Sequence, residues 1–284
     1  MAKQWSSAAL SLRNPSSRTA QYAPGASLPA ALHLAIPEQA PSHCYSDTLL
    51  ESVGADPITV LARGAAALGV PLSPLQLDQF ARYLTELEKW NRRINLTGTR
   101  DPHEIVIRHL LDSLAGEKVL RDLSNEAEVA DLGSGAGFPG LPLKIARPAV
   151  RLTLIEPRQK RAAFLLHVCG VLGLPNIQVA EATIMADRPP PEYAGRFDCV
   201  VMRAVADPVE AVRLARPLLR PGGKVIVWVS EWQAAQLSGQ GSGQYELISY
   251  QIPESMITSA LLLVHSENHS LPPFFKGGNS LLQR

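Results

Sequence analysis

The stretch that most constrains this chain runs from Val129 to Gly140 (VADLGSGAGFPG), where a short apolar segment ending in an acid leads into three alternating glycines. Gly133, Gly135 and Gly137 tolerate positive φ and carry no Cβ, so the backbone there can pass close to a ligand. Residues 141–146 look helical, and the free N–H groups at the start of that helix should point at the same crevice. The pattern predicts a strand, a turn and a helix that bind a nucleotide-type cofactor.

The spacing of the three glycines differs from that of two common nucleotide sites. The dinucleotide fingerprint is Gly-x-Gly-x-x-Gly, and a loop that grips β and γ phosphates carries Gly-Lys-Ser or Gly-Lys-Thr; this turn has neither. Glu156 follows about twenty residues later, at the end of the apolar segment 150–155, where an acid can accept hydrogen bonds from a ribose diol. The turn and the acid together favour a cofactor site over a purely structural turn.

Apolar segments alternate with helical ones in residues 124–265, which predicts an α/β domain with a parallel sheet. The expected strands are 129–132, 150–155, 176–180, 197–202 and 224–229, with a turn at 221–223, helices at 141–146, from 157 to Gly170 or Gly173, and at 209–219, and a candidate antiparallel pair at 245–252 and 260–265. Right-handed crossovers place helices on both faces of such a sheet. Ligands bind at the carboxyl ends of the strands, where Gly133, Glu156 and Arg203 should converge.

Residues 56–123 are predicted to form an N-terminal helical cap. Asp56-Pro57 and Ser73-Pro74 each place a capping side chain before a proline at the first helical position, and Gly69 should end the first helix. A third helix should begin after Asp101-Pro102. The apolar positions recur at helical spacing, as Leu77, Phe80, Leu84, Leu87 and Ile94 in the second helix and Ile105, Ile107, Leu110, Leu111 and Leu114 in the third.

Arg108 and Asp112 lie four residues apart in the third helix, so they should share one face and can pair there, with His109 and Ser113 beside them. From spacing alone, this is an ordinary surface ion pair, of the kind that contributes only about 0.5 kcal/mol. His109 and His167 are expected to be core or surface histidines rather than catalytic bases.

The composition fits a single catalytic domain with an appendage. The chain has 284 residues, 46% hydrophobic and 19% charged, with a net charge of +1, so any nucleic-acid surface must be local. Three scattered cysteines (Cys44, Cys169, Cys199) indicate neither a disulfide framework nor a zinc site, and no metal is expected. No apolar run is long enough to span a membrane. These features favour a cytoplasmic protein, which we expect to be a monomer.

The two terminal segments lack apolar periodicity. Residues 1–55 are rich in Ser, Ala and Pro and are predicted to be disordered; a flexible extension or a misassigned start is favoured over an organelle transit peptide. Residues 266–284 are expected to be a flexible tail.

Several separate motifs occur in an order that resembles one known family. They are Trp90-Asn91, Ile94-Asn95-Leu96-Thr97, Arg108-His109-x-x-Asp112-Ser113, Asp131-x-Gly-Ser-Gly-x-Gly-Phe-Pro-Gly-x-Pro142 and Met202-Arg203-Ala204-x-Ala206. Together they are similar to the RsmG (GidB) family of 16S rRNA guanine-N7 methyltransferases, over roughly residues 56–229. The resemblance implies a Rossmann-like class I methyltransferase fold with a helical cap, S-adenosyl-L-methionine as cofactor, and the small ribosomal subunit as partner.

The resemblance also assigns roles to residues of this chain. Asp131, Ser134, Gly135 and Gly137 belong to the cofactor motif; Gly133 and Phe138 line the methionine side, Glu156 the ribose and Arg203 the mouth of the site. The helix with Arg108, His109 and Asp112 lies beside the active site, which favours a functional role for these three over the surface ion pair. Arg203 is expected to meet the cofactor's carboxylate, an RNA phosphate or a flipped guanine.

The chain departs from the family pattern at positions around the expected site. Ile184 and Met185 stand near the adenine, where the family usually has an Arg, a small residue and an acid. Val229-Ser230 replaces a Lys-Gly pair, and Ser259 or a neighbour replaces a basic residue, so positive charge is lost on the expected RNA side.

The implied reaction needs no general base, because guanine N7 carries a free lone pair and no proton. Holding the two reactants in line can then supply most of the catalysis. Cys169 and Cys199 are expected to be packing residues, which disfavours methyl transfer through a cysteine. Two alternatives remain open: a methyltransferase of the same fold that acts on a small molecule or a protein, and a silent ribosome- or RNA-binding relative.

Overall fold

The computed structural model describes residues 55–204, 207–238 and 245–267. The predicted extension at residues 1–55 and the tail at 266–284 lie almost entirely outside these ranges. Within the described residues, no helix combines the length and the apolar character that crossing a bilayer requires.

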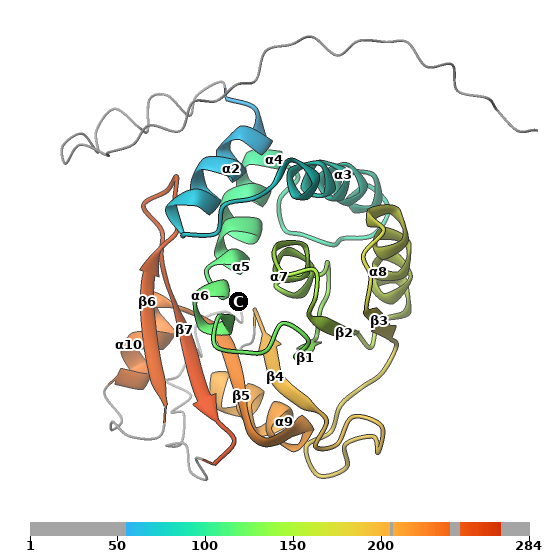
Figure 1. Cartoon of the computed structure of the whole chain (residues 1–284), viewed down its shortest axis with the longest axis vertical. Helices are drawn as coiled ribbons and strands as arrows, with labels where there is room; N and C mark the ends of the chain where they lie inside the picture. Colours follow the sequence, from blue (N-terminus) through green and yellow to red (C-terminus); the bar gives the residue numbers. More distant parts are fainter. Residues whose placement is uncertain (1–54, 205–206, 239–244, 268–284) are drawn as a thin grey trace, which may run out of the picture. The chain divides into compact units, whose positions relative to one another are not determined.

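A seven-stranded sheet in the order β3-β2-β1-β4-β5-β7-β6 forms the framework (Figure 1). Its strands are β1 (Glu128–Leu132), β2 (Arg151–Ile155), β3 (Ile177–Ala180), β4 (Phe197–Met202), β5 (Leu219–Ser230), β6 (Glu246–Gln251) and β7 (Thr258–His265). The first five are mutually parallel, and β7 is antiparallel to both β5 and β6. This confirms the Rossmann-like class I methyltransferase fold, including the final antiparallel pair.

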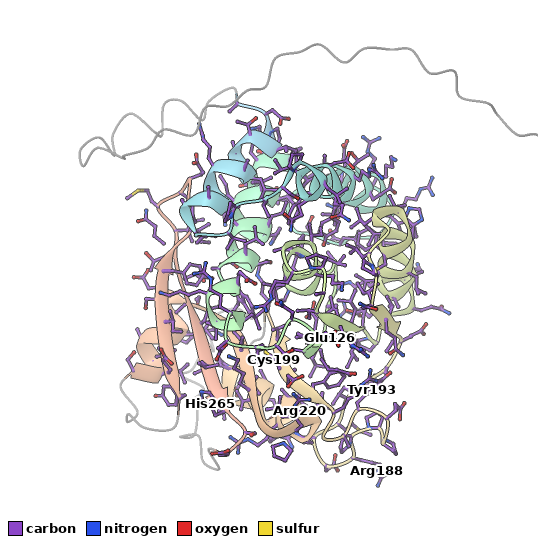
Figure 2. All side chains as sticks on the ribbon, in the orientation of Figure 1. Glu126, Arg188, Tyr193, Cys199, Arg220 and His265 are labelled. Atoms are coloured by element: carbon purple, nitrogen blue, oxygen red, sulfur yellow. The ribbon has the colours of Figure 1, made fainter. Side chains whose placement is uncertain are left out.

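The order of the strands reverses between β1 and β4, which are neighbours in the sheet. In an open parallel sheet the two connections at such a point leave in opposite directions, so a crevice opens beyond the carboxyl ends of the strands. Arg220 near the start of β5 and His265 at the end of antiparallel β7 mark the opposite edge (Figure 2). The glycine turn and Arg203 therefore lie at the edge where ligands bind.

Helices cover both faces of the sheet, as predicted. One core joins the sheet to α7 (Gly140–Ala146), α8 (Gln159–Leu172) and the cap, and the other joins it to α9 (Pro208–Ala215) and α10 (Glu231–Ser238). The side chains of Ile226 and Val227, adjacent in β5, belong to different cores, as strand alternation requires.

The first two cap helices begin where their capping residues predict. Asp56 accepts hydrogen bonds from the backbone at the start of α2 (Pro57–Ala67), and Ser73 and Gln76 form a capping box at the start of α3 (Pro74–Asn91). The apolar side of α3 packs against α7 and α8. The prediction that Ile94 belongs to this helix is wrong, because α3 ends at Asn91; Ile94 reaches the core from the following turn.

The third cap helix is not the regular α-helix that the sequence predicts. It consists of α4 (Pro102–Ile105), the π-helix η1 (Val106–Leu111) and α5 (Asp112–Leu114), followed by α6 (Glu117–Leu120). A π-helical turn is wider than an α-helical one, and such turns occur frequently at functional sites. Residues four apart across η1 therefore lose the shared face that a regular helix would give them.

Three further differences concern the C-terminal half. The helix predicted over 209–219 is α9, which ends at Ala215 and passes into a 3₁₀ turn, η2 (Arg216–Leu218), because Pro217 cannot continue an α-helix. Strand β5 begins at Leu219 and so includes the predicted turn 221–223. The helix α10 was not predicted; its buried residues are only Ala234 and Leu237, too few for a clear periodic signal.

Candidate functional site

The glycine turn is attached to the end of the neighbouring strand β2. The backbone N–H groups of Gly133 and Ser134 both donate to the Ile155 carbonyl, at 2.8 and 3.2 Å. The next N–H, of Gly135, donates to Glu156 Oε2 at 2.8 Å. The turn and Glu156 thus lie together at the carboxyl edge of the sheet, as predicted, and Glu156 is already part of the turn's hydrogen bonding.

Asp131, at the start of the turn, is fully buried and holds the beginning of α7. Its Oδ2 accepts from the N–H of Gly140 at 2.9 Å, while its Oδ1 has no partner among the described residues. Burial raises the pKa of the carboxyl to about 7, although the hydrogen bond from Gly140 opposes the shift. The prediction that this helix start offers a free N–H to a ligand is therefore wrong for Gly140, because Asp131 takes it.

The three glycines differ in what surrounds them. Gly133 is exposed at φ +76°, and a Cβ there would meet no atom within 4 Å. At Gly137, with φ +96°, a Cβ would lie 2.8 Å from the Tyr83 hydroxyl and closer still to Leu141. Gly137 is therefore required by packing, whereas Gly133 opens onto free space.

Tyr83, a cap residue that the sequence analysis did not single out, closes the inner side of the turn. Its hydroxyl donates to the Ala136 carbonyl at 2.5 Å, and its ring centroid lies 5.7 Å from that of Phe138. The ring of His109, from η1, stacks on Phe138 at 4.9 Å between centroids and 17° between planes. Phe138 of the turn is thus held between two rings of the cap.

Arg203, at the end of β4, binds to the π-helix rather than projecting freely into the mouth of the site. Its Nε lies 3.0 Å from Asp112 Oδ2, and its Nη2 lies 2.9 Å from His109 Nδ1. The guanidinium also donates to the carbonyls of Arg108 and His109 and lies 5.9 Å from the centroid of the Phe138 ring. The charge of Arg203 is balanced by Asp112. It therefore does not need the cofactor carboxylate, RNA phosphate or guanine that the sequence analysis expected as its partner.

The prediction that Arg108 pairs with Asp112 is wrong. Asp112 is buried and pairs with Arg203, whereas the Arg108 guanidinium is exposed and lies 3.9 Å from Glu104. The π-turn explains the difference, since it places residues 108 and 112 on different sides of the helix. Arg108 contributes its backbone carbonyl to the Arg203 cluster and leaves its side chain in solvent.

Asp112 receives two further hydrogen bonds from strands β5 and β6, on the face of the sheet that the cap covers. The Tyr250 hydroxyl of β6 donates to Asp112 Oδ1 at 2.6 Å, and Trp228 Nε1 of β5 donates to the Asp112 carbonyl at 2.8 Å. Burial raises the pKa of Asp112, while Arg203 and Tyr250 act in the opposite direction. Sequence reasoning missed both aromatic residues, because nothing in a strand pattern shows which polar tip reaches the site.

His109 is partly buried and is held in its neutral form. Burial, then the charges of Arg203 and Arg108, lower its pKa to about 3, and only the Arg108 carbonyl acts in the other direction. His109 therefore carries no charge at neutral pH, and a pKa this low makes it a weak proton acceptor.

Four further predicted positions lie in the segment after β3, in α8 and in β4. Ile184 is buried in the core that α9 and α10 share, and Met185 is 51% exposed. Cys169 and Cys199 are free and buried, and burial raises the pKa of each thiol to about 12, which suits packing residues. A role of Ile184 and Met185 in cofactor binding stays a prediction.

Comparison with known proteins places this arrangement in a family. Residues 76–260 match the family model described as GidB, rRNA small subunit methyltransferase G. The chain belongs to this family. The match includes Tyr83, the π-helix, the glycine turn, Glu156, Arg203 and Tyr250, so the whole cluster described above lies within the region that the family shares.

Relatives of this methyltransferase G family match with substantial identity. The Ribosomal RNA small subunit methyltransferase G of Roseiflexus castenholzii is 43% identical over 166 residues, which cover 58% of this chain and 70% of that protein. The protein of the same name from Geobacter metallireducens is 34% identical over 220 residues, covering 74% and 97%.

Solved structures with more distant sequences also resemble the chain. A predicted O-methyltransferase from Agrobacterium tumefaciens has a TM-score of 0.40 and 22% identity, and covers 55% of this chain and 79% of that one. A putative S-adenosyl-L-methionine-dependent methyltransferase from Methanococcus maripaludis has a TM-score of 0.44 and 12% identity, covering 66% and 94%.

Proposed function

We propose that this chain transfers a methyl group from S-adenosyl-L-methionine to N7 of a guanine in the 16S RNA of the small ribosomal subunit. Membership of the rRNA small subunit methyltransferase G family supports the reaction. The observation that carries the proposal is the glycine turn held on Glu156, beside the buried Asp131 Oδ1, which has no partner in the part of the chain that the structure describes.

The residues at the turn fit this cofactor chemically. Glu156 already accepts hydrogen bonds from backbone N–H groups and, as a carboxylate, can accept from a ribose diol. Asp131 Oδ1, without a partner among the described residues, can accept a hydrogen bond from the ammonium group of the cofactor. Gly133 leaves open space where any side chain would stand. Phe138 presents an aromatic face next to these groups.

The reacting groups need positioning rather than acid–base catalysis. The cofactor supplies a methyl group on a positively charged sulfur, and guanine N7 offers a lone pair without a proton. The chain's contribution is to hold the base against the turn and to exclude water. The cluster of Arg203, Asp112 and His109 suits this task because its members are tied to one another and to both the cap and the sheet.

The proposal is tested first by calorimetry with S-adenosyl-L-methionine and by transfer of labelled methyl to small ribosomal subunits. Glu156→Ala should weaken cofactor binding at least ~10-fold, since a buried charge-assisted contact is lost. Glu181→Ala, which removes an exposed acid just beyond β3, is the matched control and should bind normally.

The same measurements separate the other functions. Absence of cofactor binding at high micromolar concentration would contradict the proposal and favour a silent RNA-binding relative. Cofactor binding with label transferred to a metabolite or protein pool, but not to ribosomal RNA, would point to a different acceptor on the same fold.

A further inference from the structure

The guanidinium of Arg203 has most of its hydrogen-bonding capacity occupied by its own chain. It carries five N–H donors. The Nε–H points to Asp112, Nη2 serves the Arg108 carbonyl and His109 Nδ1, and Nη1 serves the His109 carbonyl. Four of the five donors are thus engaged, so Arg203 is a brace for η1 and has too few free donors to grip a phosphate with two.

This brace fixes the tautomer of His109. A guanidinium has donors only, so His109 Nδ1, 2.9 Å from Arg203 Nη2, must accept the hydrogen bond. A neutral imidazole that accepts at Nδ1 carries its proton at Nε2. Protonation of both nitrogens is opposed because Nδ1–H would then face another N–H group. At neutral pH His109 therefore presents an uncharged Nε2–H donor.

The donor has a fixed direction and is open to a ligand. Stacking on Phe138 sets the plane of the ring, and the bond to Arg203 sets its rotation within that plane. Within residues 55–204, 207–238 and 245–267, Nε2 makes no hydrogen bond, and it is not among the fully buried polar atoms that lack one. His109 is only partly buried, and its ring lies on Phe138 of the glycine turn, so we take Nε2 as the atom that faces a bound base.

A fixed donor next to the reacting nitrogen distinguishes the two purines. On the edge that carries N7, guanine has a second acceptor, O6, whereas adenine has a donor, the N6 amino group. We propose that His109 selects the target base by donating its Nε2–H to guanine O6, which holds N7 in line for methylation. Adenine at the same place would put its N6 amino group, a donor, against the Nε2–H of His109. This inference rests on the proposed function.

The neutral state of His109 also suits the charge change of the reaction. The N7 lone pair forms the bond to the methyl carbon, the sulfur keeps the electron pair of the bond that breaks, and no proton leaves the base. The positive charge thus moves from the sulfur to the guanine ring. An imidazolium against that ring would oppose the transfer, while a neutral donor does not, and the low pKa of His109 keeps it neutral.

The first test replaces His109 by Phe, which keeps an aromatic ring against Phe138 but removes the donor. The kcat/KM for methyl transfer to small subunits from cells that lack this enzyme should fall about 10- to 100-fold, while affinity for S-adenosyl-L-methionine stays the same. His109→Gln, which restores an N–H donor, should recover part of the rate. His167→Phe on α8, where a histidine packs against Trp90, is the matched control and should retain full activity.

A second measurement tests the choice of base directly. Small subunits in which adenine replaces the guanine that the unmodified enzyme methylates should not be methylated by that enzyme. His109→Gln should methylate them measurably, because the amide oxygen of Gln can accept from the adenine amino group. This readout does not depend on the stability of the Phe variant, and a purely structural role of His109 would leave the choice of base unchanged.

The outcomes separate this inference from the proposed function. Full activity of His109→Phe, unchanged rejection of adenine by His109→Gln, or a loss of cofactor affinity as large as the loss of rate would each overturn the role of His109. The proposed function and the role of His109 both require that the unmodified enzyme methylates guanine N7. If it does not, both are overturned.

Discussion

Arg203 joins the sheet to the cap through a nearly buried ion pair. Its side chain is 15% exposed and that of Asp112 is 7% exposed. Removing one partner of such a pair leaves an uncompensated charge in a poor solvent, which typically costs 3–5 kcal/mol. The sequence predicts that Arg203 serves activity alone, whereas the structure gives it a structural role as well.

We therefore expect Arg203→Ala to reduce both stability and activity. The free energy of unfolding in urea should fall by about 3 kcal/mol, and methyl transfer should fall at least ~100-fold because η1 loses its brace. Arg203→Lys should recover part of the stability but little activity, since an ammonium cannot replace a planar fork. Arg92→Ala removes an exposed ion pair with Glu88 and should cost less than about 1 kcal/mol. Equal stability of Arg203→Ala and the parent would contradict this account.

Asp131 makes the stability depend on pH in a predictable direction. Its pKa is about 7 in the folded chain and about 3.9 when unfolded, so between these values the folded state holds a proton that the unfolded state releases. Stability should therefore fall as the pH rises from about 4 to 7 and then level off. Asp131→Asn keeps an acceptor for Gly140 and should flatten this dependence. Melting curves from pH 4.5 to 8 for both proteins test this, and parallel curves would exclude Asp131 as the cause.

At the scale of elements, the π-helix η1 is the part to which the site is attached. It lies between α4 and α5, and its residues contact β4 through Arg203, while Asp112 immediately after it reaches β5 and β6. Four elements thus meet at one turn. The wider π-turn sends Asp112 inward while His109 faces the glycine turn.

The link from β6 is tested by Tyr250→Phe, which removes one hydroxyl and nothing else. Asp112 Oδ1 then loses its hydrogen bond in a buried place, so the free energy of unfolding should fall by about 1–3 kcal/mol. Methyl transfer should also fall, because Asp112 orients Arg203. Tyr245→Phe, just before β6 and on the opposite face of the sheet, removes a hydroxyl that donates to the Leu237 carbonyl; it is the control and should leave methyl transfer unchanged. Unaltered activity of Tyr250→Phe would show that β6 does not support the site.

At the scale of the whole molecule, the cap and the sheet share one core. Residues of α2, α3 and η1 belong to the same buried cluster as residues of β1, β2 and α7. The cap is therefore not a separate folding unit in the sense of having its own core. The domain boundary expected near residue 123, between the cap and the methyltransferase domain, stays a prediction.

The N-terminal extension is expected to contribute little to this core. Deleting residues 1–52 should leave the melting temperature and methyl transfer unaltered, because that segment shows no apolar periodicity to bury. Thermal melts of the two lengths of chain, followed by circular dichroism, measure this. A loss of more than about 2 kcal/mol would show that the extension packs on the domain.

The sequence by itself determined the framework of this protein and the approximate place of its site. Strand and helix periodicity, the capping residues and the glycine turn are local signals, so the order of β1 to β5 and the convergence of Gly133, Glu156 and Arg203 follow from nearby residues alone. The motifs between Trp90 and Ala206, taken together, indicated the family that the comparison then showed.

Only the tertiary structure decided which of these side chains act together. The π-turn depends on packing against α2 and the sheet, so a regular helical spacing paired Arg108 with Asp112 incorrectly. Tyr83, Trp228 and Tyr250 reach the site from distant parts of the chain, and no local pattern marks them. Burial, which sets the neutral state of His109 and the raised pKa of Asp131, is a property of the assembled core and of no single segment.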